Sequence, residues 1–182
     1  MSIERVTRFT RTVFQEVTRP ADTNAYTAGD VISDSTSAPT VITFGNVARE
    51  SGGNGTIVHA VCVDSANVAT KPDLELWLFD TTVTPDNDNA AFTPTDAELK
   101  TLAGVIAFPT ASFKAGDATS GAGGNSICEA TSLNIAFKAA GATNSALYGV
   151  LVVRNAYAPV SAESFFFRLK IPGSTCSFLP GH

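Results

Sequence analysis

The sequence feature that most constrains the fold is a strict alternation of apolar and polar residues along short segments. In residues 164–171 the apolar positions of one face are Phe165, Phe167, Leu169 and Ile171. Residues 133–138 repeat this period of two. Because successive side chains of a β-strand point to opposite faces, this period predicts strands with one buried and one wetter face.

Two further segments, residues 74–79 and 147–153, are apolar on almost every position. A strand of this kind needs cover on both faces, so we expect both to be central strands. The cover can come from the rest of the chain or from another subunit. Another two candidate strands are residues 41–48 and 56–64. The Gly-rich residues 49–55 between them predict a hairpin.

One short helix is expected after Pro94. Thr95 and Glu98 have the spacing of a capping box, and Gly104 stands where a helix C-terminus favours glycine. About eight or nine short strands with turn signals between them account for most of the rest. We therefore predict an all-β fold: a jelly-roll-like antiparallel β-sandwich with one short helix and an extended N-terminal arm.

Composition narrows the function classes. The 182 residues are 44% hydrophobic and only 16% charged, which is too apolar for a disordered chain. The net charge of −5 argues against direct nucleic-acid binding. No apolar run reaches the roughly 18 residues of a membrane span, and the first residues do not form a secretory signal. We expect folding in a reducing cytosol, with Cys62, Cys128 and Cys176 as reduced, small apolar side chains.

The first twenty residues differ from the rest in charge. They carry two glutamates and four arginines, Arg5, Arg8, Arg11 and Arg19, a net charge of +2. The remainder holds 8 of the 12 basic and 15 of the 17 acidic residues, a net charge of −7. Val and Thr predominate in this segment and favour a strand, although an apolar spacing of three to four residues leaves a helix open. We predict that residues 1–20 form an arm or edge strand and residues 21–182 a single sandwich domain.

Side-chain chemistry points to few sites. His59 and His182 are the only histidines and no cysteine stands at zinc-ligand spacing, so zinc and other cofactors are not expected. Asp86 and Asp88 are candidate calcium ligands, because calcium prefers carboxylate oxygens; a solvated turn is the alternative. An EF-hand does not fit, since Ala97 stands where such a loop requires a glutamate.

Six stretches carry a resemblance to a known family: residues 25–33, 47–49, 71–80, 88–92, 94–99 and 147–155. Together they resemble virion structural proteins of tailed bacteriophages, a family of small proteins similar to capsid decoration or cement proteins. The resemblance implies a jelly-roll-like sandwich on the virion, at the capsid surface. It carries no catalytic residues, so we expect that the protein is not an enzyme.

The expected mechanism is binding. A decoration protein stabilises a shell by bridging subunits of the major capsid protein, as a homo-oligomer and preferably a trimer. The candidate interface consists of apolar residues on the doubly apolar strands and of the arginines of the arm: Trp77, Phe79, Tyr148, Arg5, Arg8 and Arg11. The alternative is a carbohydrate- or receptor-binding sandwich of a phage fibre or tail, with a glycosidase as a more distant third reading.

Overall fold

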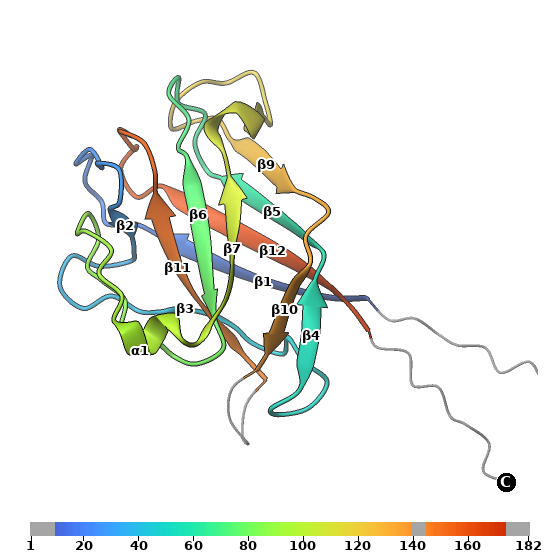
Figure 1. Ribbon diagram of the computed structural model, residues 1–182. Coiled ribbons are helices and arrows are strands. Elements are labelled where there is room, and N and C mark those ends of the chain that lie inside the picture. The colour runs from blue at the N-terminus through green and yellow to red at the C-terminus, as the bar shows by residue number, and fades with distance from the viewer. Residues whose placement is uncertain (1–9, 140–144, 174–182) are drawn as a thin grey trace, which may run out of the picture.

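The fold is built around two antiparallel sheets packed face to face (Figure 1). The computed structural model describes residues 10–139 and 145–173. The first sheet has the strand order β1-β12-β5-β9-β8. Its strands are β1 (Thr10–Thr18), β12 (Ser164–Pro172), β5 (His59–Asp64), β9 (Ser126–Ala130) and β8 (Lys114–Ala115).

The second sheet has the order β2-β11-β6-β7, and β3 also pairs with β11. Its strands are β2 (Val31–Ile32), β11 (Leu147–Val153), β6 (Leu74–Phe79), β7 (Leu102–Phe108) and β3 (Ile42–Phe44). A separate two-stranded ladder joins β10 (Ile135–Lys138) to β4 (Asn54–Ile57). The predicted all-β sandwich is confirmed, whereas its jelly-roll connectivity stays a prediction.

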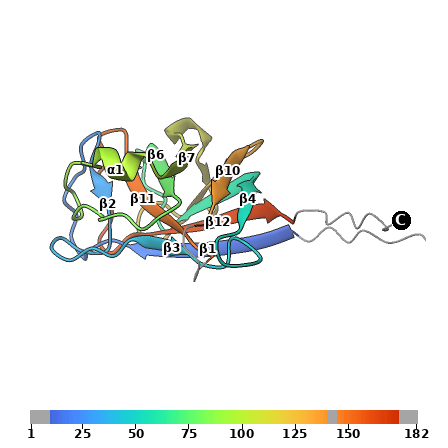
Figure 2. The same cartoon turned by 60° about the horizontal axis from the view of Figure 1, so that its bottom comes forward.

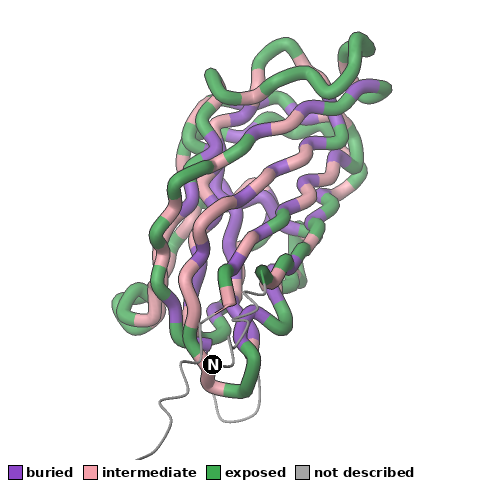
Figure 3. The backbone as a smooth tube through the Cα atoms, turned by 90° about the vertical axis from the view of Figure 1, so that its right-hand side faces the viewer, coloured by how far each residue is buried: buried purple, intermediate pink, exposed green. Residues whose placement is uncertain are grey.

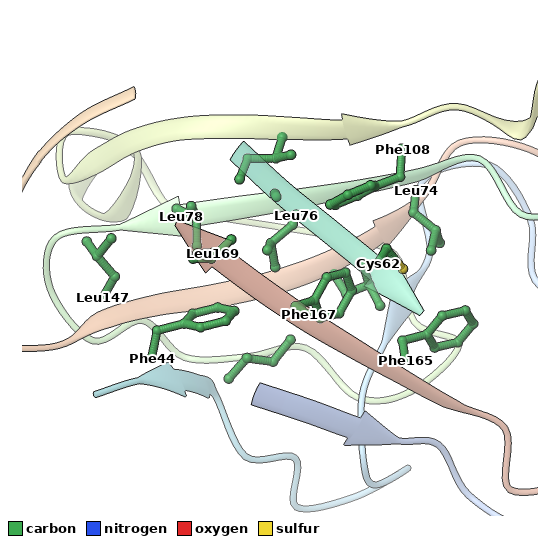
Figure 4. Packing of buried hydrophobic residues seen from close by; sticks show 14 of the residues in the cluster. Phe44, Cys62, Leu74, Leu76, Leu78, Phe108, Leu147, Phe165, Phe167 and Leu169 are labelled. Carbon is green, nitrogen blue, oxygen red and sulfur yellow. The ribbon is translucent and has the colours of Figure 1, made fainter. Parts of the chain in front are cut away.

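The core lies between the sheets and follows the alternation seen in the sequence. All four residues of the inward face of β12, namely Phe165, Phe167, Leu169 and Ile171, are at most 3% exposed. They meet the inward residues of the second sheet, including the leucines of β6 and Phe108 of β7 (Figure 4). The rings of Phe108 and Phe167 lie 5.7 Å apart across this interface.

The double burial predicted for residues 74–79 and 147–153 is also confirmed, since β6 and β11 are the central strands of the second sheet. Their outer face is covered by the same chain. A second apolar cluster packs Val83 and Phe92, from the segment between β6 and β7, against Val150 and Val152 of β11. Figure 2 shows this segment, with α1 (Asp96–Leu99), on the side of the sandwich opposite β1 and β12.

Two predictions rested on short sequence motifs, the capping box of the helix and the Gly-rich hairpin, and only the first is confirmed. The capping box is present: Thr95 accepts a hydrogen bond from the Glu98 backbone, and the Glu98 side chain accepts one from the Thr95 backbone. The predicted hairpin is wrong, because β3 pairs with β11, β4 with β10, and β5 with β12 and β9. Glycines permit a tight turn, but the strands beside them pair with more distant strands of matching apolar pattern.

The N-terminal segment forms an edge strand over its described part. All nine residues of β1 pair with β12, from Thr10 opposite Pro172 to Thr18 opposite Ser164. Val13 and Val17 face the core, so the described part of residues 1–20 is an edge strand of the sandwich, one of the two forms predicted for this segment. Arg5 and Arg8 lie outside the described residues.

Candidate interaction surface

The outer face of the first sheet carries a half-exposed apolar strip. Phe14 of β1 is 64% exposed, the most exposed large apolar side chain of the described residues. Its ring stacks on Phe166 of β12, with ring centroids 5.8 Å apart. Phe166 lies opposite Val63 of β5, which lies opposite Ile127 of β9. We call these four residues, Phe14, Phe166, Val63 and Ile127, the outer strip.

Charges of both signs border the outer strip. Glu16 lies opposite Phe166 and Arg168 lies opposite Phe14, both across the β1–β12 ladder. Figure 3 shows exposed and half-buried positions alternating with buried ones along these strands. None of the four strip residues belongs to an apolar core cluster. An apolar centre with a charged border is the usual composition of a protein–protein contact.

The apolar residues proposed from the sequence lie on the other sheet and are largely held by their own chain. Trp77 is half-buried: its Nε1 donates to Glu75 at 2.9 Å, and its ring meets Phe92 edge-on at 5.1 Å. Tyr148 is half-buried on the same face. Phe79 is completely buried in the second cluster. The prediction that Phe79 contacts a partner is therefore wrong, because the segment between β6 and β7 already covers it.

Arg11 forms contacts within the chain. Its Nη1 donates to the backbone carbonyls of Asn46, at 2.9 Å, and of Ala48. It thus ties β1 to the loop after β3, beside an open cavity of about 450 Å³ whose lining includes Thr12 and Arg49. The proposed contact of Arg11 with an acidic groove of a partner stays a prediction.

The two candidate calcium ligands have different hydrogen-bond partners. Asp86 accepts hydrogen bonds from the Thr93 backbone and hydroxyl, both at 3.0 Å. Asp88 is buried and accepts from the Tyr26 hydroxyl at 2.7 Å and the Ser33 backbone at 3.0 Å. Across residues 10–139 and 145–173, no cluster of three His, Cys, Asp or Glu side chains is arranged to hold a metal ion. Asp86 and Asp88 thus serve different loop contacts, and a calcium site at this pair stays a prediction.

Asp88 belongs to a buried ionic cluster that the sequence did not indicate. Arg19 is 2% exposed and donates to the Tyr26 hydroxyl at 2.8 Å and to Asp22 at 2.7 Å. Its Nη2 lies 3.6 Å from Asp88. Burial raises the pKa of Asp88, although its hydrogen bonds from Tyr26 and Ser33 and the charge of Arg19 oppose the shift. The cluster fixes the chain that follows β1, and a buried ion pair of this kind is costly to break.

A second buried cluster contains two carboxyl groups in contact. Asp64 accepts from the Ala66 backbone at 2.7 Å and from Ser126 at 3.0 Å, and Glu163 accepts from the Val160 backbone at 2.9 Å. Burial, and next the hydrogen bond and charge of Glu163, raise the pKa of Asp64 to about 8. At neutral pH the Asp64 carboxyl therefore keeps its proton.

Both carboxyl groups are at most 1% exposed, so no substrate reaches them in this structure. A paired acid and base would otherwise be the chemistry of a glycosidase. Here the pair joins the end of β5 to the start of β12 and has a structural role.

The cysteines behave as small apolar residues where they are described. Cys62 and Cys128 lie opposite each other in the β5–β9 ladder, both buried and both free thiols. Burial raises the pKa of Cys128 to about 11 and that of Cys62 in the same direction. Both thiols are therefore protonated and unreactive at neutral pH. Cys176 lies outside the described residues.

Comparisons with known proteins add no relative. No family model matches the chain, and no curated protein is similar to it. In the described part of the chain, no helix has the length and apolar character needed to cross a bilayer. The outer strip, as an exposed apolar surface with a charged border, is therefore the basis for the proposed function.

Proposed function

We propose that this chain is a structural protein of a phage virion that binds the major capsid protein through the outer strip and stabilises the shell without catalysis. The observation that carries the proposal is the stacked pair of Phe14 and Phe166 on the open face of the first sheet. The resemblance described above supplies the particle and the homo-oligomer, with a trimer as its preferred form.

The exposed ring of Phe14 can contribute measurably to a contact. A buried phenylalanine contributes roughly 200 Å² of apolar surface, and 64% of Phe14 is open to solvent. Covering that part is worth about 3 kcal/mol at roughly 25 cal/mol per Å². Phe166, Val63 and Ile127 extend the same surface across three strands, so a partner that covers all four residues gains more than this.

The test is binding to undecorated shells, measured by co-sedimentation. Val63→Lys places a charge in the middle of the outer strip, on a half-buried side chain that is outside the core. Ala107→Lys is the matched control, because Ala107 is exposed on β7 of the other sheet. We expect Val63→Lys to weaken binding about tenfold or more and Ala107→Lys to bind as the unchanged protein does. Equal binding of Val63→Lys, or no binding by the unchanged protein, overturns the proposal.

A second candidate, carbohydrate or receptor binding by a fibre or tail protein, is favoured by the same aromatic pair. Exposed stacked rings suit the apolar face of a sugar. Trp77 is not the platform for such a site, because Phe92 and Arg154 already pack against its ring. A glycan array that is positive for the free protein and negative for Phe14→Ala, together with no binding to shells, selects this candidate.

A further inference from the structure

The edge of β1 has main-chain groups without a partner in the described structure. β1 is the outermost strand of the first sheet and pairs only with β12. Continuing that ladder, the Arg19 backbone N–H donates to the Glu163 carbonyl at 3.0 Å. In an antiparallel pair, residues that exchange hydrogen bonds alternate with residues that do not. The odd-numbered residues of β1 therefore bond to β12.

The even-numbered residues direct their N–H and C=O groups away from β12. These residues are Thr10, Thr12, Phe14, Glu16 and Thr18. None of them forms a main-chain hydrogen bond on that side with a residue of the described ranges. Their side chains lie on the outer face of the sheet and all five are exposed.

The other edges of the two sheets are poor alternatives for pairing. β8 and β2 have only two residues each. β7 is longer, but Ile135 of β10 lies against it so closely that a Cβ at Gly104 would come within 2.8 Å of that side chain. β1, with nine residues, is the longest edge strand among the described strands. β3 and the loop at residues 46–51 lie near it, but they form no main-chain hydrogen bond with its outward groups. Proteins normally cover or interrupt such an edge, because it is a template for another strand.

The β1 edge is self-complementary about a two-fold axis through Phe14. In an antiparallel pair of two copies, Phe14 lies opposite Phe14, Thr12 opposite Glu16, and Thr10 opposite Thr18. Each outward N–H then meets an outward C=O of the other copy. Such a contact is isologous, as two-fold symmetry requires.

The side chains agree with this register. Glu16 is the only charged residue among the five, and it faces the uncharged Thr12 of the other copy, so no like charges oppose each other. Phe14 meets its own copy and extends the stack with Phe166, whose ring lies 5.8 Å away, to four rings across the axis. The pairing places Phe14 beside its own copy in the plane of the sheet, so the outer face of both rings stays open to a further partner.

We propose that β1 pairs with β1 of a second copy of this chain about a two-fold axis through Phe14, so that the two first sheets form one continuous sheet. The occupant of the edge is thus the protein itself. This pairing differs from the trimer that the resemblance implies. It is independent of shell binding, because it rests on the main-chain edge and is measured without a shell.

The test uses opposite charges at the axis. Phe14→Glu alone places two carboxylates opposite each other, and Phe14→Lys alone places two ammonium groups opposite each other. Each variant by itself should weaken dimerisation about tenfold or more in sedimentation equilibrium. An equimolar mixture of the two should form a heterodimer, because unlike charges then face each other. Phe14 is exposed in the single chain, so neither change disturbs the core; circular dichroism checks the fold, and Ala107→Lys is the control.

A third variant tests the main-chain bonds separately. Glu16→Pro removes one outward N–H and leaves the bonds between β1 and β12 in place. It should weaken the dimer as the single-charge variants do. A monomeric or trimeric unchanged protein, dimers of undiminished affinity for all three variants, or a mixture that stays monomeric overturns the proposal. Val63→Lys should remain a dimer even if it loses shell binding, which separates the two proposals.

Discussion

Replacing Asp64 with asparagine should make the protein more stable at neutral pH. The folded chain holds the pKa of this carboxyl at about 8, whereas its ordinary value is 3.8. Between these two values the folded state binds a proton that the unfolded state has lost. The free energy of unfolding therefore falls as the pH rises through this window, by about 1.4 kcal/mol per pH unit. Below pH 3.8 this cost is absent, and above about pH 8 it no longer grows.

At pH 7 the accumulated cost is about 4 kcal/mol, since pH 7 lies about three units above the ordinary pKa. Asp64→Asn removes this cost, because an amide carries no charge in either state. The amide keeps the shape of the carboxyl, can accept from the Ala66 backbone, and can donate to Glu163 and to the Ser126 hydroxyl. That hydroxyl lies 3.1 Å from the Ala66 carbonyl, to which it can donate instead.

The assay is urea unfolding of both proteins between pH 5 and pH 9. We expect the unchanged protein to lose stability towards pH 8, and Asp64→Asn to be up to about 4 kcal/mol more stable at pH 7 with a flatter profile. Asp117→Asn, on the loop after β8, is the control for removal of one carboxylate. Asp88 remains in all three proteins, so its own raised pKa cancels in the comparison. Profiles of equal slope for the unchanged protein and Asp64→Asn would refute the raised pKa of Asp64.

Two other substitutions test the packing. Tyr26→Phe removes the hydroxyl that accepts from Arg19 and donates to Asp88. It should lower the free energy of unfolding by about 2–3 kcal/mol in urea titration. No loss of stability would contradict a structural role for this buried hydroxyl. Gly55→Ala should cost about 1–3 kcal/mol in the same assay, because the added Cβ would lie 2.7 Å from the Phe137 ring. A neutral result there would show that this ring moves aside freely.

The parts of the fold that could be predicted from the sequence are the strands whose pattern of apolar residues matches their pattern of burial. The inward face of β12 and the double burial of β6 and β11 follow from local pattern, since two-residue periodicity and continuous apolar runs are properties of each strand alone. The false hairpin shows the limit of that reasoning. Turn residues permit a reversal of the chain, but strand pairing depends on segments far away in the sequence.

The candidate surface was predicted less well than the fold. Phe14 and Phe166 occupy positions where the alternation of their strands calls for polar residues. These two exceptions were the only sign in the sequence of an apolar surface on the outer face. Their contact depends on the pairing of β1 with β12, which spans almost the whole chain. The same holds for Asp64 and Glu163, whose meeting cannot be read from either segment alone. Phe79 was misplaced because a doubly apolar strand does not reveal whether its own chain or a partner covers it.

The two outer faces of the sandwich differ in how far they are covered. The segment between β6 and β7 covers the outer face of the second sheet, and no such segment of the described residues covers the outer strip. One side is sealed by Val83 and Phe92, and the other leaves Phe14 open. A chain docked by its open side has only one possible orientation and turns the sealed side outward. If the shell contact proposed above is made, the turn that contains Asp86 and the exposed Asn87 points away from the shell. A peptide inserted into this turn would be displayed to the medium, with the contact beneath it undisturbed.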